Sequence, residues 1–184
     1  FILRRTAVIN EKYLPAKVEE TVFCRMTDIQ LAVYRKIASM ALDGRQGDGK
    51  AQALAIITTL KKLTNHPDLV YHYIRDRPDA YPGVLALFPP DYKVGALQTL
   101  TSASGKVRVL DGLLQAMQEV RHPSGLRDKM VVVSNYTQTL DVLAALCKHR
   151  RWGFFQLDGN TPIKRRQELV DLFNVPNSRE TVFL

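Results

Sequence analysis

The chain has 184 residues, of which 46% are hydrophobic, and its 26 Lys and Arg against 18 Asp and Glu give a formal net charge of +8. This size and composition predict one or two domains with a real core, and the surplus of positive charge favours a polyanionic partner, nucleic acid first. They exclude other classes, because no stretch approaches the roughly 20 apolar residues of a membrane span, and two distant cysteines with four scattered histidines form neither a disulfide framework nor a metal site.

Helical signals dominate residues 1–71. Thr27 and Gln30 have the spacing of a capping box, and apolar residues then recur at helical spacing from Ile29 to Met40. A second helix is predicted over 51–63. The first third of the chain is therefore expected to be mainly helical.

The helical pattern ends before Pro67, because the residue before a proline is pushed out of the helical region. Between 72 and 104 the periodicity fades among prolines and glycines, which predicts an irregular linker or insertion. Ser104 and Gly105 then precede another helix, whose apolar face is formed by Leu110, Leu113, Leu114 and Met117.

The last third alternates predicted strands and helices. The continuous apolar run 130–133 is typical of a parallel strand that is buried on both faces. A helix over about 139–149, a strand over 154–157, a helix with apolar residues between 169 and 173, and a strand from Thr181 follow. This βαβαβ order predicts an α/β fold with a parallel sheet and right-handed crossovers.

One glycine-rich segment imitates a phosphate-binding loop. Residues 44–50 fit the first seven positions of G-x-x-x-x-G-K-[ST], but Ala51 has no hydroxyl to bind magnesium. A helix precedes the segment where the motif needs a strand. We therefore interpret it as a flexible connection between helices and not as a nucleotide site.

Two polar loops are expected at the carboxyl edge of the predicted sheet, where open parallel sheets bind ligands. The loops 134–138 and 158–161 are rich in side-chain donors suited to phosphate oxygens. The alternative is ordinary turn and capping chemistry, with Thr161 as N-cap and Pro162 at the first helical position. For Asp158, Gly159 and Thr161 that alternative is at least as good.

Three cations, Lys164, Arg165 and Arg166, fall in the first turn of a predicted helix. The helix dipole makes exposed cations there unfavourable by roughly 0.3–1 kcal/mol each, and an anion nearby would reverse the sign. A solvated basic face is the alternative. A second cluster, 148–151, lies at a helix C-terminus, where its charges suit the dipole and are interpreted as structural. No nucleophile–base pair stands out.

Four motifs resemble the Swi/Snf-like DNA translocases of helicase superfamily two. They are Phe1–Thr6 with Lys12–Pro15 (end of the first motor lobe), Lys61–Pro67 (K-K-L-C-N-H-P, with Thr64 for Cys), Ser104-Gly105-Lys106 (start of the second lobe) and Lys129–Asp141 (motif IV). The Asn-Tyr-Thr-Gln-Thr form of motif IV resembles the recombinational-repair branch, the Rad-fifty-four-like proteins. Within that branch, residues 22–25, 87–92 and 158–163 look closest to the B-type paralogue.

The resemblance implies three regions in this chain. They are the end of the first motor lobe with a helical protrusion (1–71), a linker or insertion (72–104) and the start of a second RecA-like lobe (105–184). In the family the phosphate loop and the Asp-Glu-x-His box would lie before Phe1, and the arginine finger after Leu184. The chain is thus expected to be an internal fragment with no catalytic, cofactor-binding or metal-binding residue and no ATPase activity of its own.

For the whole protein the resemblance implies an ATPase that uses ATP and magnesium to move along double-stranded DNA. It also implies a nuclear role in homologous recombination and DNA repair, assisting a recombinase filament, without membrane association. In that picture the DNA-facing residues are Ser134, Asn135, Tyr136, Thr137, Gln138, Asn160, Thr161, Lys164, Arg165 and Arg166. A chromatin remodeller of the same family and a stand-alone nucleic-acid-binding or scaffolding module are the alternatives.

Overall fold

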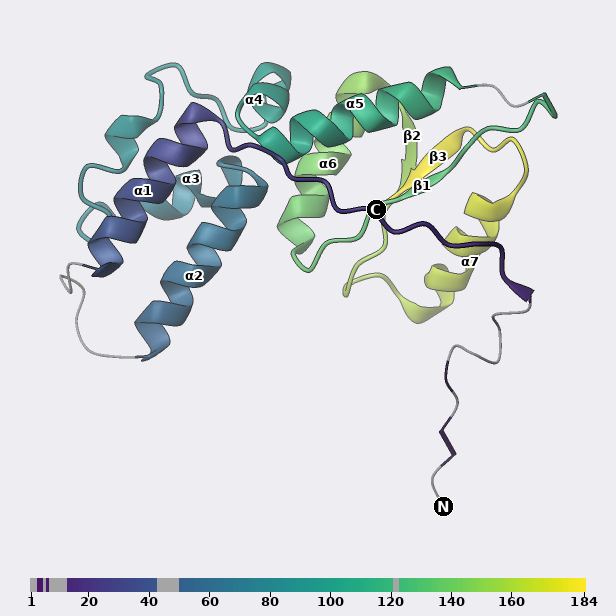
Figure 1. The fold of residues 1–184 in the computed structure, drawn as a ribbon, viewed down its shortest axis with the longest axis horizontal. Helices are drawn as coiled ribbons and strands as arrows, with labels where there is room; N and C mark the ends of the chain where they lie inside the picture. Colours follow the sequence, from purple (N-terminus) through teal and green to yellow (C-terminus); the bar gives the residue numbers. More distant parts are fainter. Residues whose placement is uncertain (1–2, 5, 7–12, 43–49, 121–122) are drawn as a thin grey trace.

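The computed structural model of the chain describes residues 3–4, 6, 13–42, 50–120 and 123–184. Figure 1 shows two parts side by side, a group of helices at the left and a small sheet with its own helices at the right. Helices combined with a parallel sheet confirm the predicted fold class. The glycine-rich segment 44–49 and residues 1, 2, 5 and 12 of the first motif lie outside the described residues.

The helical part comprises α1 (Asp28–Leu42), α2 (Lys50–Asn65), α3 (Asp68–Arg75) and the 3-10 turn η2 (Leu85–Leu87). The predicted capping box opens α1, because the Gln30 N–H donates to Thr27 Oγ1 at 3.3 Å and the Thr27 N–H donates to Gln30 Oε1 at 3.1 Å. The buried apolar side chains of this part form one core, which contains Val33, Ile37, Ile56, Leu63, Val70, Ile74, Tyr81, Val84 and Phe88.

The segment 72–104 is more regular than its fading periodicity predicts. α3 continues into it, η2 follows, and α4 (Leu97–Ser102) ends just before the segment does. The rings of Tyr71, Phe88 and Tyr92 pack on one another with centroids 5.0 to 5.2 Å apart. Such short helices depend on tertiary packing more than on local sequence preference, which is why periodicity missed them. The identity of the segment 72–104 as a linker or insertion stays a prediction.

The sheet part comprises α5 (Gly105–Glu119), β1 (Met130–Val131), α6 (Thr137–Arg150), β2 (Gly153–Phe155), α7 (Ile163–Asn174) and β3 (Glu180–Phe183). Both neighbours of β3 run parallel to it, and the strand order is β1-β3-β2. The predicted parallel βαβαβ arrangement is confirmed. Val182 is buried in the core with side chains of α5 and α6, whereas the Phe183 ring lies 5.1 Å from Phe173 of α7. The helices therefore lie on both faces of the sheet.

The prediction that the run 130–133 is buried on both faces is wrong. Val131 is 61% exposed and Val133 is 85% exposed. Val131 is in register with Phe183, on the face where α7 packs against the central strand β3. The side chains of β1 on that face extend beyond the cover of α7 and remain exposed.

The sheet part is closed on its other face by α5 and α6. An ion pair joins these helices, with Arg150 donating to both carboxylate oxygens of Asp111 at 3.0 and 2.5 Å. Cys147 of α6 is fully buried, and burial raises the pKa of its thiol to about 11. Within the described ranges, none of the helices combines the length and apolar character needed to cross a bilayer.

Candidate nucleic-acid interface

The two polar loops lie where the sequence predicts them, at the carboxyl edge of the sheet. β1 and β2 flank β3, and pairing continues beyond the strands through Val132 N–H to Phe183 O and Leu157 N–H to Leu184 O, both 2.8 Å. The chain then leaves β1 at Ser134 and β2 at Asp158. Both loops therefore start at the same edge, on either side of the central strand.

The first loop turns directly into α6. Ser134 Oγ accepts the Tyr136 N–H at 3.2 Å, and α6 begins at Thr137. Thr137 and Gln138 thus occupy the first helical turn, where backbone N–H groups lack intrahelical partners. Asn135, Thr137 and Gln138 are exposed and Ser134 and Tyr136 are half-buried. The loop presents several donors to solvent at a helix N-terminus.

A lysine from the helical part reaches this loop, and the sequence analysis missed it. Lys62 of α2 donates to Gln138 Oε1 at 2.8 Å, and its Nζ lies 5.8 Å from the centre of the Tyr136 ring. Next to it, Asn65 Nδ2 donates to Thr139 Oγ1 at 3.4 Å. The Lys61–Pro67 motif contains Lys62, but a contact with a residue 76 positions later leaves no local signal in the sequence.

The second loop is a closed turn. Thr161 Oγ1 accepts the Asp158 N–H at 3.0 Å and lies 3.2 Å from Asp158 Oδ1, which also accepts the Asn160 N–H at 2.9 Å. The expectation that Thr161 caps α7 and Pro162 is its first residue is wrong by one position. Pro162 itself is the N-cap residue, and its ring has no acceptor for a cap bond, while the Thr161 hydroxyl is engaged in the turn. Asn160 remains exposed.

The three cations at the start of α7 have different surroundings. Arg166 donates to the carbonyls of Thr161, Asp158 and Gly159 at 3.0 to 3.4 Å, so it holds the second loop. Arg165 forms an ion pair with Glu168 one turn later. Lys164 is exposed, and among the described residues it has no ion-pair partner. Of the three, Lys164 is the cation most available to an anion.

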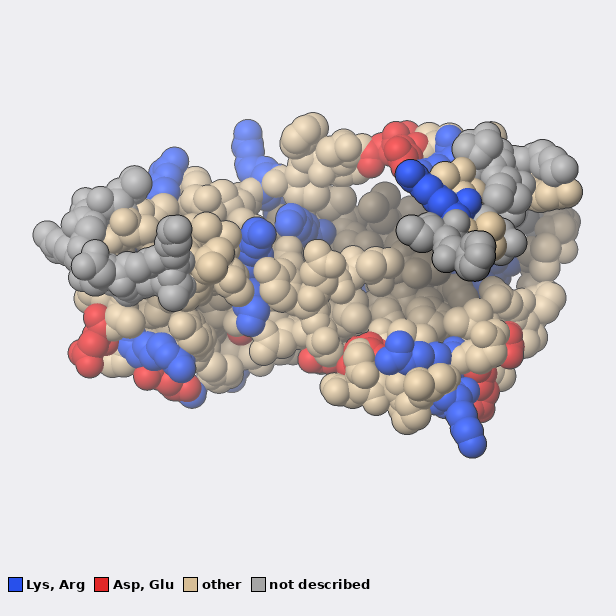
Figure 2. Space-filling view, turned by 90° about the horizontal axis from the view of Figure 1, so that it is seen from below, with Lys and Arg blue, Asp and Glu red and all other residues tan. Residues whose placement is uncertain are grey.

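In the basic cluster at the end of α6, Arg150 has a structural partner, and a structural role for the other cations stays a prediction. Arg150 is bound to Asp111, and this interaction raises the pKa of Arg150. Arg151 ends the helix in the left-handed region, at φ 60°. Figure 2 shows Lys and Arg spread over one face and interleaved with Asp and Glu, so on this face the described residues do not gather into one basic patch.

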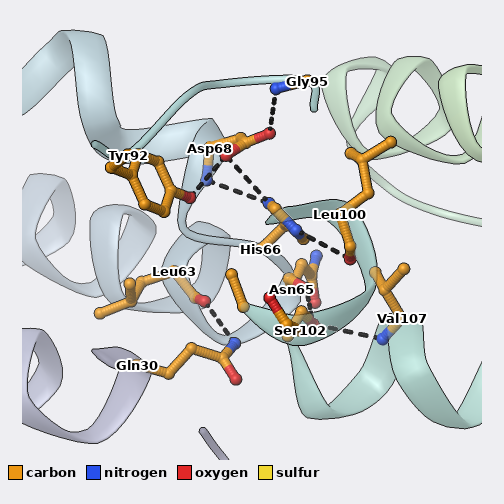
Figure 3. Close-up of polar contacts among 12 residues, drawn as sticks. Gln30, Leu63, Asn65, His66, Asp68, Tyr92, Gly95, Leu100, Ser102 and Val107 are labelled. Carbon is orange, nitrogen blue, oxygen red and sulfur yellow. Dashed lines mark hydrogen bonds and ion pairs between the residues drawn. The ribbon is translucent and has the colours of Figure 1, made fainter. Parts of the chain in front are cut away.

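The motif residues of α2 and α5 meet in a buried joint between the two parts (Figure 3). Gln30 is 1% exposed; its Nε2 donates to Leu63 O at 2.9 Å and to Thr64 O at 3.3 Å, and its Oε1 accepts the Gly105 N–H at 3.1 Å. One amide thus satisfies carbonyls at the end of α2 and the first N–H of α5.

Ser104 adds a second connection across the joint. Its Oγ donates to Asn65 O at 2.7 Å and accepts the Val107 N–H at 3.2 Å as the N-cap of α5. Lys106 donates to Asn65 Oδ1 at 3.0 Å. A Cβ on Gly105 would lie 1.8 Å from Arg25 O, so this close approach requires glycine. The S-G-K and K-K-L-T-N-H-P motifs are therefore one structural unit.

A buried histidine anchors the adjoining segment (Figure 3). His66 Nδ1 accepts the Asp68 N–H and Nε2 donates to Leu100 O, both at 3.1 Å. Burial lowers the pKa of His66, and the nearby Asp68 carboxylate opposes this shift only in part. The ring is therefore neutral. The 3.6 Å distance between Asp68 Oδ1 and His66 Nδ1 is thus not an ion pair. Asp68 instead accepts from Tyr92 Oη and the Gly95 N–H at 2.5 and 2.8 Å.

A cavity of about 780 Å³ lies beside the joint, between α2, α3 and α6. Its walls are mainly apolar, with Lys62 and Asp141 among its polar lining. Among the residues that the structure describes, no group of three or more His, Cys, Asp or Glu could hold a metal ion.

The chain resembles known proteins in sequence and in fold. The SNF2-related domain matches residues 1–69. The chain is 41% identical to the human "DNA repair and recombination protein RAD54-like" and 40% identical to the human "DNA repair and recombination protein RAD54B", in both cases over its whole length. "Protein CHROMATIN REMODELING 25" of Arabidopsis thaliana is also 40% identical. The chain spans only 24%, 21% and 21% of the lengths of these three relatives, in the order given.

Solved structures share the fold. The C-terminal part of the Fun30 ATPase domain matches with a TM-score of 0.61, 21% identity and coverage of 92% of this chain and 68% of that one. The Sulfolobus solfataricus SWI2/SNF2 ATPase core in complex with dsDNA matches with a TM-score of 0.60, 21% identity and coverage of 100% and 34%. The nearly equal identities to the two human relatives do not separate the paralogues, so the B-type assignment stays a prediction.

Proposed function

Because the chain belongs to the RAD54-like group of SNF2-related proteins, we propose that it is part of an ATP-driven motor that moves along double-stranded DNA in recombination and repair. The similarity over the full chain, at about 40% identity, is the observation that carries this proposal. The chain supplies the end of the first lobe (1–71), the connection (72–104) and the start of the second lobe (105–184).

The proposed role of the sheet edge is to hold the phosphate backbone. Exposed donors of Asn135, Thr137 and Gln138 lie at the start of α6, and positive charge is supplied by Lys164 and, from the helical part, by Lys62. Contacts of this kind fix register on the duplex without reading its sequence. The rest of the proposed DNA-facing set consists of Ser134, Tyr136, Asn160, Thr161, Arg165 and Arg166.

The nucleotide chemistry of the proposed motor needs residues beyond those present. ATP with magnesium requires a phosphate loop and an acidic group, whereas the near match at 44–50 is followed by Ala51, which has no hydroxyl to bind magnesium. These residues do not fit the nucleotide and its metal. We propose a nuclear location and a recombinase partner for the longer protein only.

The proposal is tested by DNA-stimulated ATP hydrolysis in the longer protein. Activity that depends on duplex DNA, together with displacement of a triplex strand during movement, is the expected result. DNA affinity should fall steeply with salt and vary little with sequence, because phosphate contacts release counterions. The chain by itself should bind DNA weakly and hydrolyse no ATP. Absence of DNA-dependent hydrolysis in the longer protein would contradict the proposal.

Chromatin remodelling is the second candidate, because one relative carries that name at 40% identity over the whole chain. Repositioning of nucleosomes by the longer protein, at a rate comparable with its movement on bare DNA, would favour this alternative. Movement on bare DNA without repositioning would favour the recombination motor.

A further inference from the structure

We propose that Gln30 is a positioning residue that couples the two parts of the motor through α5, an inference that rests on the proposed function. Gln30 is buried, and its amide bonds both the end of α2 and the start of α5. Its Oε1 also accepts the Thr27 N–H at 3.1 Å and the Thr27 hydroxyl at 3.4 Å, so both ends of the amide are engaged. A side chain satisfied in this way has one orientation, and it fixes the two helix ends relative to each other.

The sheet part is fixed to the other side of α5. Val107 and Leu114 of α5 are buried in one core with Leu143 and Leu146 of α6. The Asp111–Arg150 ion pair ties the middle of α5 to the end of α6. α5 is therefore held at its start by the helical part and along its length by the sheet part.

The connection from the joint to the proposed DNA-facing loop is short. α6 begins with Thr137 and Gln138, and α6 is packed on α5. Displacement of the start of α5 on α2 would therefore shift the first turn of α6 relative to Lys62 of α2. Gln30 sets this relation without touching the proposed DNA site, and that is the sense in which it is a positioning residue.

The exposed contacts between the two parts have a different character. The Lys62–Gln138 and Asn65–Thr139 hydrogen bonds involve partly exposed side chains, and such contacts are weak in water. The two parts are thus held together by the buried Gln30 joint and by Leu69 of α3, which packs against the core of the sheet part, whereas the Lys62 and Asn65 contacts are open to competition from water.

The test uses the longer protein and the substitution Gln30→Met, which keeps the length of the side chain and removes its donors and acceptor. Thr59→Val is the matched control, because Thr59 is also buried and bonds Ala55 O within α2, away from the joint. Two quantities are measured: the number of base pairs moved per ATP hydrolysed, and the distance between spin labels introduced at Lys61 of α2 and Gln115 of α5 through unnatural amino acids.

We expect Gln30→Met to lower the base pairs moved per ATP at least threefold, to leave DNA-stimulated hydrolysis within about twofold, and to broaden the label distance. Thr59→Val should change neither. Equal losses of movement and hydrolysis in both variants, or an unchanged label distance in Gln30→Met, would overturn the proposal.

Ser104→Ala gives a second route if Gln30→Met fails to fold. It removes the hydroxyl that bonds Asn65 O across the same joint. It should also broaden the spin-label distance and lower the number of base pairs moved per ATP hydrolysed. An unchanged distance and coupling in this variant would overturn the proposal. If the unaltered longer protein neither hydrolyses ATP nor moves, the proposed function fails, and the label distances alone then decide the role of Gln30.

Discussion

The ammonium group of Lys62 lies 2.8 Å from the side-chain oxygen of Gln138, 76 residues later in the chain, and joins α2 to the first turn of α6. A positive charge at the proposed DNA-facing edge of the sheet therefore comes from the helical part.

Lys62→Met in the longer protein tests whether this charge belongs to the interface. If Lys62 contacts a phosphate, the slope of log affinity against log salt should decrease by about 0.9, the contribution of one phosphate contact. Stability should change by less than about 1 kcal/mol, since Lys62 is partly exposed. Lys61→Met is the control, because Lys61 is exposed one position earlier on α2. The same slope for wild type and Lys62→Met would remove Lys62 from the interface.

Gly105→Ala should be severely destabilising. The added methyl group would lie 1.8 Å from the Arg25 carbonyl oxygen, and the obstacle is backbone that cannot rotate away. We expect a loss of about 3 kcal/mol or more. Gly112→Ala on the same helix should stabilise by roughly 0.5–1 kcal/mol, because nothing lies within 4 Å and alanine favours helix. Urea unfolding measures both, and similar effects of the two substitutions would contradict the close contact.

His66 should make stability depend on pH. Its pKa is lowered in the folded state from the ordinary value of 6.5, so below that value the unfolded chain binds a proton that the folded chain does not. The contribution of neutral His66 to the free energy of unfolding is therefore fully present above about pH 6.5. The free energy of unfolding decreases as the pH falls below that value, by up to about 1.4 kcal/mol per pH unit. The decrease stops once the pH is below the folded-state pKa.

Thermal unfolding of wild type and His66→Gln between pH 5 and 8 isolates this contribution. The variant should be less stable at pH 8 and should lose less stability on acidification. The exposed His72 provides the control, since His72→Gln should leave the wild-type pH dependence in place. Parallel curves for wild type and His66→Gln would be inconsistent with a neutral buried ring.

Lys164 and Arg166 should respond differently to replacement by alanine. Lys164→Ala should weaken DNA binding and raise stability slightly, because an exposed cation at a helix N-terminus is unfavourable by roughly 0.3–1 kcal/mol. Arg166→Ala should cost about 1–2 kcal/mol, because it removes charge-assisted hydrogen bonds to three carbonyls. DNA titration and chemical unfolding distinguish the two.

The control for non-specific loss of charge is the pair Lys148→Ala and Arg151→Ala, which leaves the Arg150–Asp111 ion pair intact. Equal weakening of DNA binding by this pair and by Lys164→Ala would mean that net charge, and not this site, governs binding.

Local sequence signals predicted the elements whose causes are local. The Thr27–Gln30 spacing predicted the capping box, Ser104 the start of α5, and the repeated strand–helix order the parallel sheet. The exposure of Val131 could not be predicted, because an apolar run is compatible with any number of covered faces. Nor could the second role of Gln30, whose partners Leu63 and Gly105 become neighbours only in the fold.

The sequence predicted where the residues of the candidate site lie, but it did not predict which contacts each side chain makes. Chain order and the parallel sheet placed both loops at one edge. The difference between Lys164 and Arg166 depends on the backbone of the 158–161 turn, which offers carbonyls to one side chain only. The contribution of Lys62 depends on a contact between parts that are distant in sequence.

The joint also determines where the chain can change in length. His66 and Asp68 hold Leu100, Tyr92 and Gly95, so both ends of the intervening segment are anchored. Extra residues inserted near 77–79, before the buried Tyr81, would lengthen an exposed loop between fixed ends, at a cost that grows only with the logarithm of its length. An insertion of even one residue at 104–106 would instead displace the helix start from Gln30. Relatives that keep this joint are therefore expected to differ in length before Leu87 and to agree residue for residue from Ala103 to Lys106.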